Sequence, residues 1–330
     1  MSNFALPMDL PNFSAAVKDS KSEFAPARLA AVVSLGVVDS DNVSMAIDTL
    51  VPLLSDPVEE IRVQTIDSLA SLTQRGGKVD AERIWPLLED PNTNIRCVTI
   101  EMLHIFFDVP LEAALQASKD ADAAVRLSAV LLLSNIENDG AISRLEEMVH
   151  DTDREVSEQA ALQLGAALTD AARVLLESIV LKRQQASRSA LISLSKAQPT
   201  MRSAEIVQQV AHGRFFSSTL KTAAAAALLE WGQQDGRTIV KQVLGSWRKS
   251  KRMAMIQTLA EMSSEHVADV LYEFICSTNR NDEASASIQA LAQCAYANHG
   301  VHRKLETLLT QLDEPLRSEV SDILTHMENP

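Results

Sequence analysis

The stretch SWRKSKR, at residues 246–252, is the part of the sequence best suited to binding chemistry. It holds four basic residues and one tryptophan, in a chain whose formal net charge is −14 at pH 7. Guanidinium and ammonium groups beside an aromatic ring can bind a carboxylate or a phosphate, and the ring adds contact area. A solvated surface turn can carry the same residues, so the stretch indicates either an anion-binding site or an exposed corner.

Residues that could serve catalysis or metal binding are scattered. Of the seven histidines only His299 and His302 lie three residues apart, and Cys97, Cys276 and Cys294 match no metal-ligand spacing. The sequence has no HExxH, GxSxG or glycine-rich phosphate-binding motif. We therefore predict no catalytic residue, no metal site and no cofactor, and we favour a protein that is not an enzyme.

Length and composition indicate a folded chain that is longer than one ordinary domain. The 330 residues are 46% hydrophobic and 22% charged, which is ordinary for a globular protein. No apolar run reaches the roughly 18 residues that a membrane-spanning helix needs. An odd number of scattered thiols favours a reducing compartment. We expect a cytoplasmic protein that does not enter a membrane.

The chain repeats a short pattern. The segments DPVEEIRVQTIDSL (56–69), DPNTNIRCVTIEML (90–103), DADAAVRLSAVLLL (120–133) and DTDREVSEQAALQL (151–164) align without gaps. Each has an Asp six residues before a slot that usually holds Arg, and an apolar residue four and seven residues after it, which places these two on one helix face. Along the chain the slot is occupied in turn by Arg28, Arg62, Arg96, Arg126, Ser157, Ser187, Lys221, Arg252, Ala284 and Arg317.

Successive slots are 30 to 34 residues apart, so ten units fill the chain. Each unit also contains a shorter apolar segment before the slot, and we predict a helix, a tight turn and a second helix. In the turn SDPVEE, Asp56 can cap the second helix, Pro57 can take its first position and Glu59 can complete a capping box. One such hairpin cannot bury its apolar stripe alone, but stacked neighbours can. The predicted fold is an all-α solenoid, and the predicted domain is a single one over 1–330.

This pattern, D-x5-R-x3-[IV]-x2-L, resembles the HEAT-repeat family, and in particular the short repeats of phycobilisome-lyase-like proteins. Pro52 and Pro86 strengthen the resemblance, because each lies ten residues before a slot, where that family often bends its first helix. The resemblance implies that the Arg reaches back to the Asp of a neighbouring unit, forming a ladder with a scaffolding role. It also implies a bilin-lyase-like accessory activity as an alternative function. Di-iron relatives use paired His-Glu dipeptides, and this sequence has only the reversed Glu265–His266.

Charge divides the chain into three segments. Residues 1–177, which include the regular repeats over 46–168, have a net charge of −16. The divergent repeats over 178–260 have a net charge of +10, and the last repeats, 261–330, have a net charge of −8. Six of the thirteen basic residues of the middle segment fall in three successive turns, LKRQQA, RFFSSTL and SWRKSK, where other units carry Asp or Glu. We call these turns the basic edge. Its predicted contact residues are Lys182, Arg183, Arg214, Phe215, Trp247, Arg248, Lys249 and Lys251, with Phe216 among them.

Stacked repeats should bring these three turns side by side as one contact surface. A short acidic segment of a partner protein fits the edge best, because the acidic flanks would repel a long polyanion. Nucleic acid is a less favoured partner: HEAT-like repair proteins bind it in a basic concave groove, whereas these bases fall on turns. The predicted function is a non-catalytic protein-binding scaffold or adaptor. A bilin-lyase-like enzyme and a nucleic-acid-binding repeat protein are the alternatives.

Overall fold

The computed structural model describes residues 11–107, 109–166, 169–297 and 299–328. Within these ranges every regular element is helical and no strand occurs, which confirms the all-α class. Contacts divide the chain into two compact units, which we call unit 1 (Met1–Leu145) and unit 2 (Glu146–Pro330). The division falls inside one helix, α8. That the ten hairpins form a single domain stays a prediction.

Unit 1 is built from short helices, several of them of the 3-10 type. In order they are α1 (Phe13–Asp19), α2 (Ala25–Gly36), η1 (Ser40–Asn42), α3 (Val43–Leu50), η2 (Val51–Ser55), α4 (Glu59–Gln74), η3 (Ala81–Arg83), η4 (Trp85–Glu89), α5 (Thr93–Phe106), α6 (Leu111–Ala117), α7 (Ala123–Ser134) and α8 (Asp139–Met148), whose last turn belongs to unit 2.

Unit 2 continues the alternation with longer first helices. Its elements are α9 (Arg154–Leu164), α10 (Asp170–Lys182), α11 (Ser187–Ser195), α12 (Met201–His212), α13 (Ser218–Glu230), α14 (Gln234–Leu244), α15 (Lys249–Leu259), α16 (Glu265–Ser277), α17 (Asn281–Ala297), α18 (His299–Gln311) and α19 (Leu316–Glu328).

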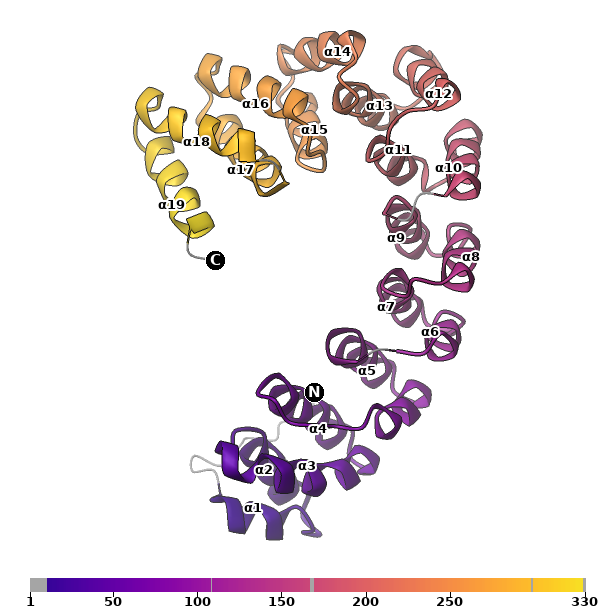
Figure 1. The fold of residues 1–330 in the computed structure, drawn as a ribbon, viewed down its shortest axis with the longest axis vertical. Helices are drawn as coiled ribbons and strands as arrows, with labels where there is room; N and C mark the ends of the chain where they lie inside the picture. The colour runs from indigo at the N-terminus through magenta and orange to yellow at the C-terminus, as the bar shows by residue number, and fades with distance from the viewer. Residues whose placement is uncertain (1–10, 108, 167–168, 298, 329–330) are drawn as a thin grey trace. The chain divides into compact units, whose positions relative to one another are not determined.

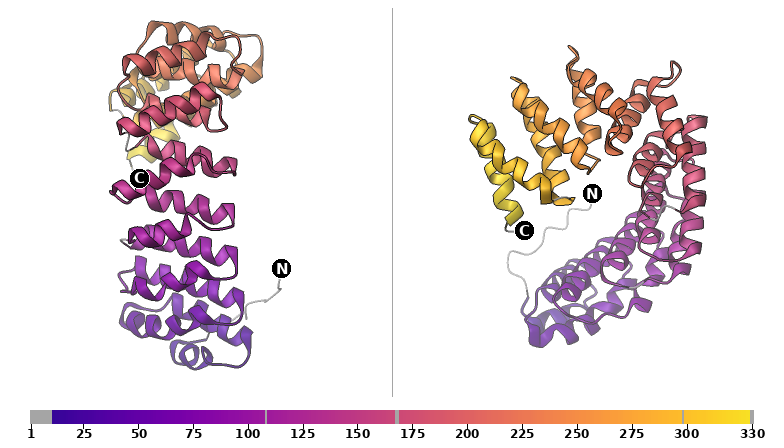
Figure 2. Two further views of the ribbon diagram at one scale, coloured as in Figure 1. Left: turned by 90° about the vertical axis from the view of Figure 1, so that its right-hand side faces the viewer. Right: turned by 45° about the horizontal axis from the view of Figure 1, so that its top comes forward.

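Each predicted slot lies near the start of the second helix of a hairpin, so the repeat pattern gave the correct elements. Second helices of successive hairpins contact each other, for example α2 with α4, α11 with α13 and α15 with α17. Within unit 2 the first helices α10, α12, α14, α16 and α18 form one row and the second helices form another (Figures 1 and 2). Each unit is therefore a stack of helical hairpins, which is the architecture of an α-solenoid.

The apolar face of the second helix forms the seam between hairpins. Leu69, Leu103 and Leu133 share the position seven residues after the slot, and each is at most 1% exposed. Pro52 and Pro86 lie in η2 and η4, where the first segment of the hairpin tightens to a 3-10 helix. Proline fits this position because it lies at the start of the tighter turn and has no N–H to leave unpaired.

The predicted capping box at SDPVEE is wrong in detail. The helix α4 begins at Glu59 with Val58 as its N-cap, so Asp56 lies two residues further out and Pro57 is not helical. Asp56 instead accepts the Val58 N–H at 2.9 Å and closes the turn. The cause is the second demand on this carboxylate, which must also face an arginine from another hairpin.

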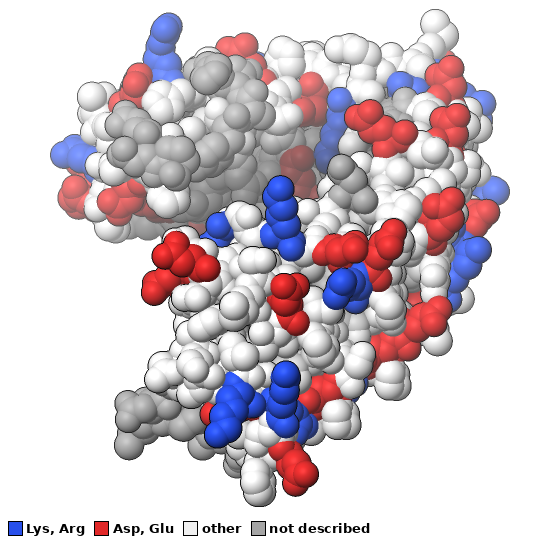
Figure 3. Space-filling model, turned by 60° about the horizontal axis from the view of Figure 1, so that its bottom comes forward, with Lys and Arg blue, Asp and Glu red and all other residues white. Residues whose placement is uncertain are grey.

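Acidic and basic residues are mixed on one face of the molecule. Figure 3 shows one face of the molecule on which acidic and basic side chains lie among many uncharged ones. Within the described ranges no single helix is both long and apolar enough to span a membrane. One sharply bent pair, Ala25–Gly36 with Ser40–Ser55, meets that criterion by length and composition alone.

Candidate binding surface

An arginine–aspartate ladder joins the hairpins of unit 1. The Nε and Nη2 atoms of each arginine donate to the two carboxylate oxygens of an aspartate in the following hairpin, at 2.6–2.9 Å. The pairing with a neighbouring unit is as expected, but it runs forward along the chain and not back. The third nitrogen of Arg62, Nη1, donates to the Asp56 carbonyl of its own hairpin at 2.9 Å. The pairs are Arg28–Asp56, Arg62–Asp90 and Arg96–Asp120.

Electrostatics show that the Arg96–Asp120 pair is charged and structural. Burial alone would raise the pKa of Asp120, but hydrogen bonds from the Arg96 guanidinium and the Asp122 N–H bring it below its usual value. The same hydrogen bond raises the pKa of Arg96, so both partners are held in their charged forms. With every carboxylate oxygen and every guanidinium nitrogen of the pair engaged, the ladder fixes the register of hairpins and offers little to a ligand.

The ladder stops in unit 2. From the fifth to the seventh hairpin the arginine slots hold Ser157, Ser187 and Lys221, and the facing aspartate positions hold Leu181, Phe215 and Ser246. Both halves of the pair are therefore replaced together at three successive steps. The three steps are the region in which the basic edge lies.

Serine in the slot bonds only within its own hairpin. Ser187 Oγ donates to the Ile179 carbonyl at 2.9 Å and cannot reach the next hairpin. The aspartate position then has no arginine above it and is open to solvent. Phe215 in that position is 81% exposed, whereas Asp56 in a regular hairpin is 6% exposed. An exposed aromatic ring thus stands where regular hairpins keep a buried ion pair.

The ladder resumes with the last residue of SWRKSKR. Arg252 is buried and donates to both carboxylate oxygens of Glu283 in α17, and its Nη1 donates to the Ser246 carbonyl. Glu283 stands one residue before the next slot, and its longer side chain on the helix replaces the turn aspartate. The Arg252 hydrogen bond lowers the pKa of Glu283 in spite of its burial. One of the four bases in this stretch is therefore part of the scaffold.

The turns of the sixth and seventh hairpins meet as predicted. The Arg183 guanidinium lies 4.7 Å from the centre of the Phe216 ring, within the range of a cation–π contact. Gly213 allows this arrangement, because a Cβ there would lie 2.7 Å from the Phe216 ring. Lys182 ends α10, and Arg183 follows it in the left-handed conformation, with a φ of 56°. Three basic residues of these two turns are exposed: Lys182, Arg183 and Arg214.

The turn of the eighth hairpin presents a second aromatic residue. Trp247 is 82% exposed, and the Arg248 guanidinium lies 4.8 Å from the centre of its ring. Lys249 differs from the prediction, because its Nζ pairs with Asp282 of the next hairpin at 2.8 Å. Lys251 is exposed and points to a cavity described below. Lys249 is thus partly neutralised, and the other predicted residues of this turn stay available.

Five cations of the basic edge lack an acidic partner. Across the described residues no carboxylate lies within ion-pair distance of these side chains, although several exposed bases elsewhere are paired, such as Arg154 with Glu158. The five are Lys182, Arg183, Arg214, Arg248 and Lys251. These five cations and two rings that are more than 80% exposed leave positive charge unpaired and apolar area uncovered in the three turns.

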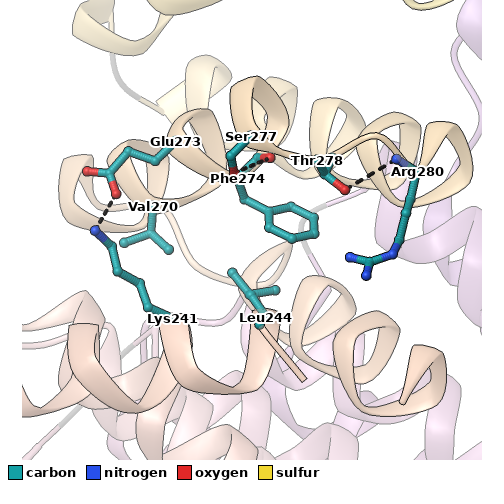
Figure 4. A pocket seen from close by; sticks show the side chains of 9 residues that line it. Lys241, Leu244, Val270, Glu273, Phe274, Ser277, Thr278 and Arg280 are labelled. Carbon is teal, nitrogen blue, oxygen red and sulfur yellow. Dashed lines mark hydrogen bonds and ion pairs between the residues drawn. The ribbon is translucent and has the colours of Figure 1, made fainter. Parts of the chain in front are cut away.

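Two cavities adjoin this region of unit 2. One, of about 500 Å³, lies between α14 and α16. Figure 4 shows Phe274 facing Leu244 across it, with Lys241 directed to Glu273 at one end. Glu273 accepts from both Lys241 and Arg237, and these hydrogen bonds lower its pKa. Lys241 is therefore already paired within the protein. Arg280, which also lines this cavity, lies 3.9 Å from Glu283, a carboxylate that already pairs with Arg252.

The other cavity, of about 530 Å³, lies along α13 and α15 and is basic. No Asp or Glu lines it, and its charged residues are Arg188, Lys221 and Lys251. Ile239 and Val243 of α14, with Met255 of α15, supply an apolar part of the wall. We call it the α13–α15 cavity. Lys251 belongs to both this cavity and the basic edge, so the two are continuous.

Sequence reasoning did not identify the α13–α15 cavity, although a signal for it existed. Lys221 was placed in the arginine slot, and Ser246 stands six residues before the next slot. Reading both positions together would have shown a cation without its aspartate. Among the described residues no group of three or more His, Cys, Asp or Glu side chains could hold a metal ion. The His299 side chain lies outside the described residues.

Comparison with known proteins gives no family. No family model matches the chain, and no curated protein matches it. Among solved structures, an engineered protein is 17% identical over 95% of this chain and 98% of its own, with a TM-score of 0.40. The Escherichia coli protein YibA is 16% identical over 92% of this chain and 98% of its own, with a TM-score of 0.39.

Karyopherins are also among the similar structures. Kap121p bound to Ste12p is 12% identical, with a TM-score of 0.47; the match covers 94% of this chain but 40% of Kap121p. The chain thus spans less than half of that protein. The three TM-scores are below 0.5, so the similarities carry no argument about function.

Proposed function

We propose that the chain is a non-catalytic protein-binding scaffold of the HEAT-repeat type, which binds an acidic segment of a partner protein on its basic edge. The observation that carries the proposal is the interruption of the ladder. At three successive steps the buried ion pair is lost, and the turns at these steps carry exposed cations and rings. We further propose that it acts in the cytoplasm, which the unpaired thiols of Cys97, Cys276 and Cys294 favour.

The chemistry of the edge supports an acidic protein segment. Guanidinium groups that already stack on rings keep their donors free at the edge of the plane, where a carboxylate can accept two hydrogen bonds. The exposed faces of Phe215 and Trp247 offer contact area to the apolar parts of the same segment. Acidic side chains elsewhere on the protein would disfavour a long nucleic acid, whose charge extends well beyond the edge.

Charge reversal tests the proposal. The triple variant Arg183→Glu, Arg214→Glu, Arg248→Glu changes three exposed residues that hold no ion pair with any described residue, so its fold and melting temperature should match the wild type. A matched control, Lys18→Glu, Lys78→Glu, Arg83→Glu, makes the same charge change in unit 1, at exposed residues that likewise pair with no carboxylate in the described part of the chain. Affinity capture from native lysate identifies partners, which are then purified.

Binding of a purified partner is measured for both variants over a range of salt concentrations. The edge variant should bind more weakly, mainly through slower association, while the control binds as the wild type does. The wild-type interaction should weaken with salt. Trp247→Ala should also weaken binding, with less dependence on salt, because the ring offers area and not charge.

Two results would count against the proposal. If the edge variant binds the partner as tightly as the wild type at low salt, the edge is only a solvated surface. If a single-stranded oligonucleotide of about 20 thymidines binds the edge and displaces the partner, nucleic acid is the ligand and the protein-scaffold proposal is wrong.

A further inference from the structure

We propose that the α13–α15 cavity is the specificity subsite of this surface, and that it takes an acidic side chain of the partner next to an apolar one. The proposal rests on the proposed function, because it concerns the same partner segment. The acidic group takes the role of the aspartate that is missing from the ladder between the seventh and eighth hairpins. The apolar side chain enters the cavity between α13 and α15.

Lys221 is the cation that such a carboxylate would meet. It stands in the arginine slot of α13, where regular hairpins direct a guanidinium at the aspartate of the next turn. Ser246 stands at that aspartate position, and among the described residues no carboxylate pairs with Lys221. Lys221 is half-buried and lines the cavity, where Arg188 and Lys251 are the other charged residues. An anion supplied from outside would restore the pairing.

Lys251 provides the second cation. It lies in the first turn of α15, lines the same cavity and holds no ion pair in the described part of the chain. Arg188, the third charged residue of the lining, is already bonded to Glu261. Two ammonium groups therefore remain for a ligand, and no acidic residue of the lining would repel its carboxylate.

The rest of the lining determines what accompanies the carboxylate. Val243 and Ile239 are partly buried against the core of unit 2, and Met255 is fully buried. A volume of about 530 Å³ is within the range of pockets that hold small ligands, and it can take one large apolar side chain with the neighbouring acidic group. A long polar polyanion would leave the apolar wall unused, so the lining favours an acidic and apolar peptide.

Two kinds of variant separate this subsite from the rest of the edge. Lys221→Met with Lys251→Met removes both cations and keeps unbranched side chains that are one atom shorter. Ala254→Trp fills the cavity from an exposed position on α15, so the helix can carry it without a change in the core. Ala171→Trp, at an exposed position of α10, is its matched control. Circular dichroism and the melting temperature establish that each variant is folded.

The probe is a random 12-residue peptide library displayed on phage and selected on the full chain. Enriched peptides should carry Asp or Glu adjacent to Leu, Ile, Val or Phe. Synthetic copies should bind the wild type and Ala171→Trp equally, and should bind each cavity variant about tenfold more weakly. The double lysine variant loses charge-assisted contacts, and Ala254→Trp removes the space for the apolar side chain.

The possible failures are distinguishable. Peptides whose binding is lost in the Arg183, Arg214, Arg248 reversal but unchanged in both cavity variants would overturn the subsite and leave the proposed function standing. Enriched peptides without acidic residues would overturn the subsite as well. Peptides that bind all variants alike, or a selection that enriches none, would overturn both proposals.

Discussion

Removing Arg96 tests the role of the ladder. Arg96 donates Nε and Nη2 to Asp120 at 2.7 and 2.9 Å, and Nη1 to the Asp90 carbonyl at 2.8 Å. The Arg96→Ala change leaves the Asp120 carboxylate, whose side chain is 13% exposed, with the Asp122 N–H as its remaining donor among these contacts. Breaking one side of a fully buried pair costs about 3–5 kcal/mol. Because some water reaches this carboxylate, we expect a loss of about 2–4 kcal/mol in the free energy of unfolding.

Urea unfolding followed by circular dichroism measures this loss, provided that the dependence on urea keeps its wild-type slope. Arg154→Ala is the control, because Arg154 is 75% exposed and pairs with Glu158 on its own helix. Exposed pairs of this kind contribute little, so its transition should nearly coincide with the wild type.

A double variant adds a sharper condition. Arg96→Ala with Asp120→Asn removes the charge that the first change leaves unpaired, so it should be more stable than Arg96→Ala alone. Equal midpoints for Arg96→Ala and Arg154→Ala, or additive losses in the double variant, would refute the view of the ladder as a coupled, partly buried pair.

Three further outcomes follow from the same structure. Leu103→Ala should lower the free energy of unfolding by about 2–5 kcal/mol, because Leu103 is fully buried at a seam, whereas Asp139→Ala at the exposed start of α8 should change it little in the same urea assay. Because the pKa of Asp120 is lowered in the folded protein, this carboxylate adds to the free energy of unfolding at every pH above its unfolded pKa, near 4. That stabilisation is lost as the pH falls through the still lower folded pKa. The free energy of unfolding, measured from pH 6 to pH 2, should therefore decline less in Asp120→Asn than in the wild type. Burial raises the pKa of Cys294 to about 12, so a thiol reagent at pH 8 should modify the exposed Cys276 first and reach Cys294 only after unfolding; equal rates in the native protein would contradict the buried position.

The hairpin fold follows from the sequence because each repeat encodes it within about 30 residues. Apolar residues four and seven positions after the slot define one helix face, and the turns between helices carry turn-forming residues such as Asp and Pro. Errors arose where one residue serves two hairpins. Asp56 was predicted to cap its helix, yet it closes the turn and faces Arg28, which lies 28 residues away.

The basic edge was predicted in part for the same reason. The repeat placed Lys182, Arg183, Arg214 and Arg248 in corresponding turns, and the structure shows them exposed and without carboxylate partners in the described part of the chain. The sequence does not show which bases are already paired. Lys249 bonds to Asp282 and Arg252 to Glu283, and each of these partners comes from a hairpin more than 30 residues further on.

What the sequence alone determined is therefore the hairpin, its seam and the turns that carry charge, since all three are fixed by short-range periodicity. The tertiary structure decided which charges are neutralised and where a cavity opens. Lys221 illustrates the difference. Its place in the slot is a matter of sequence, but its lack of a partner depends on how α13 packs against α15, because an ion pair needs two side chains from different hairpins to meet within about 4 Å.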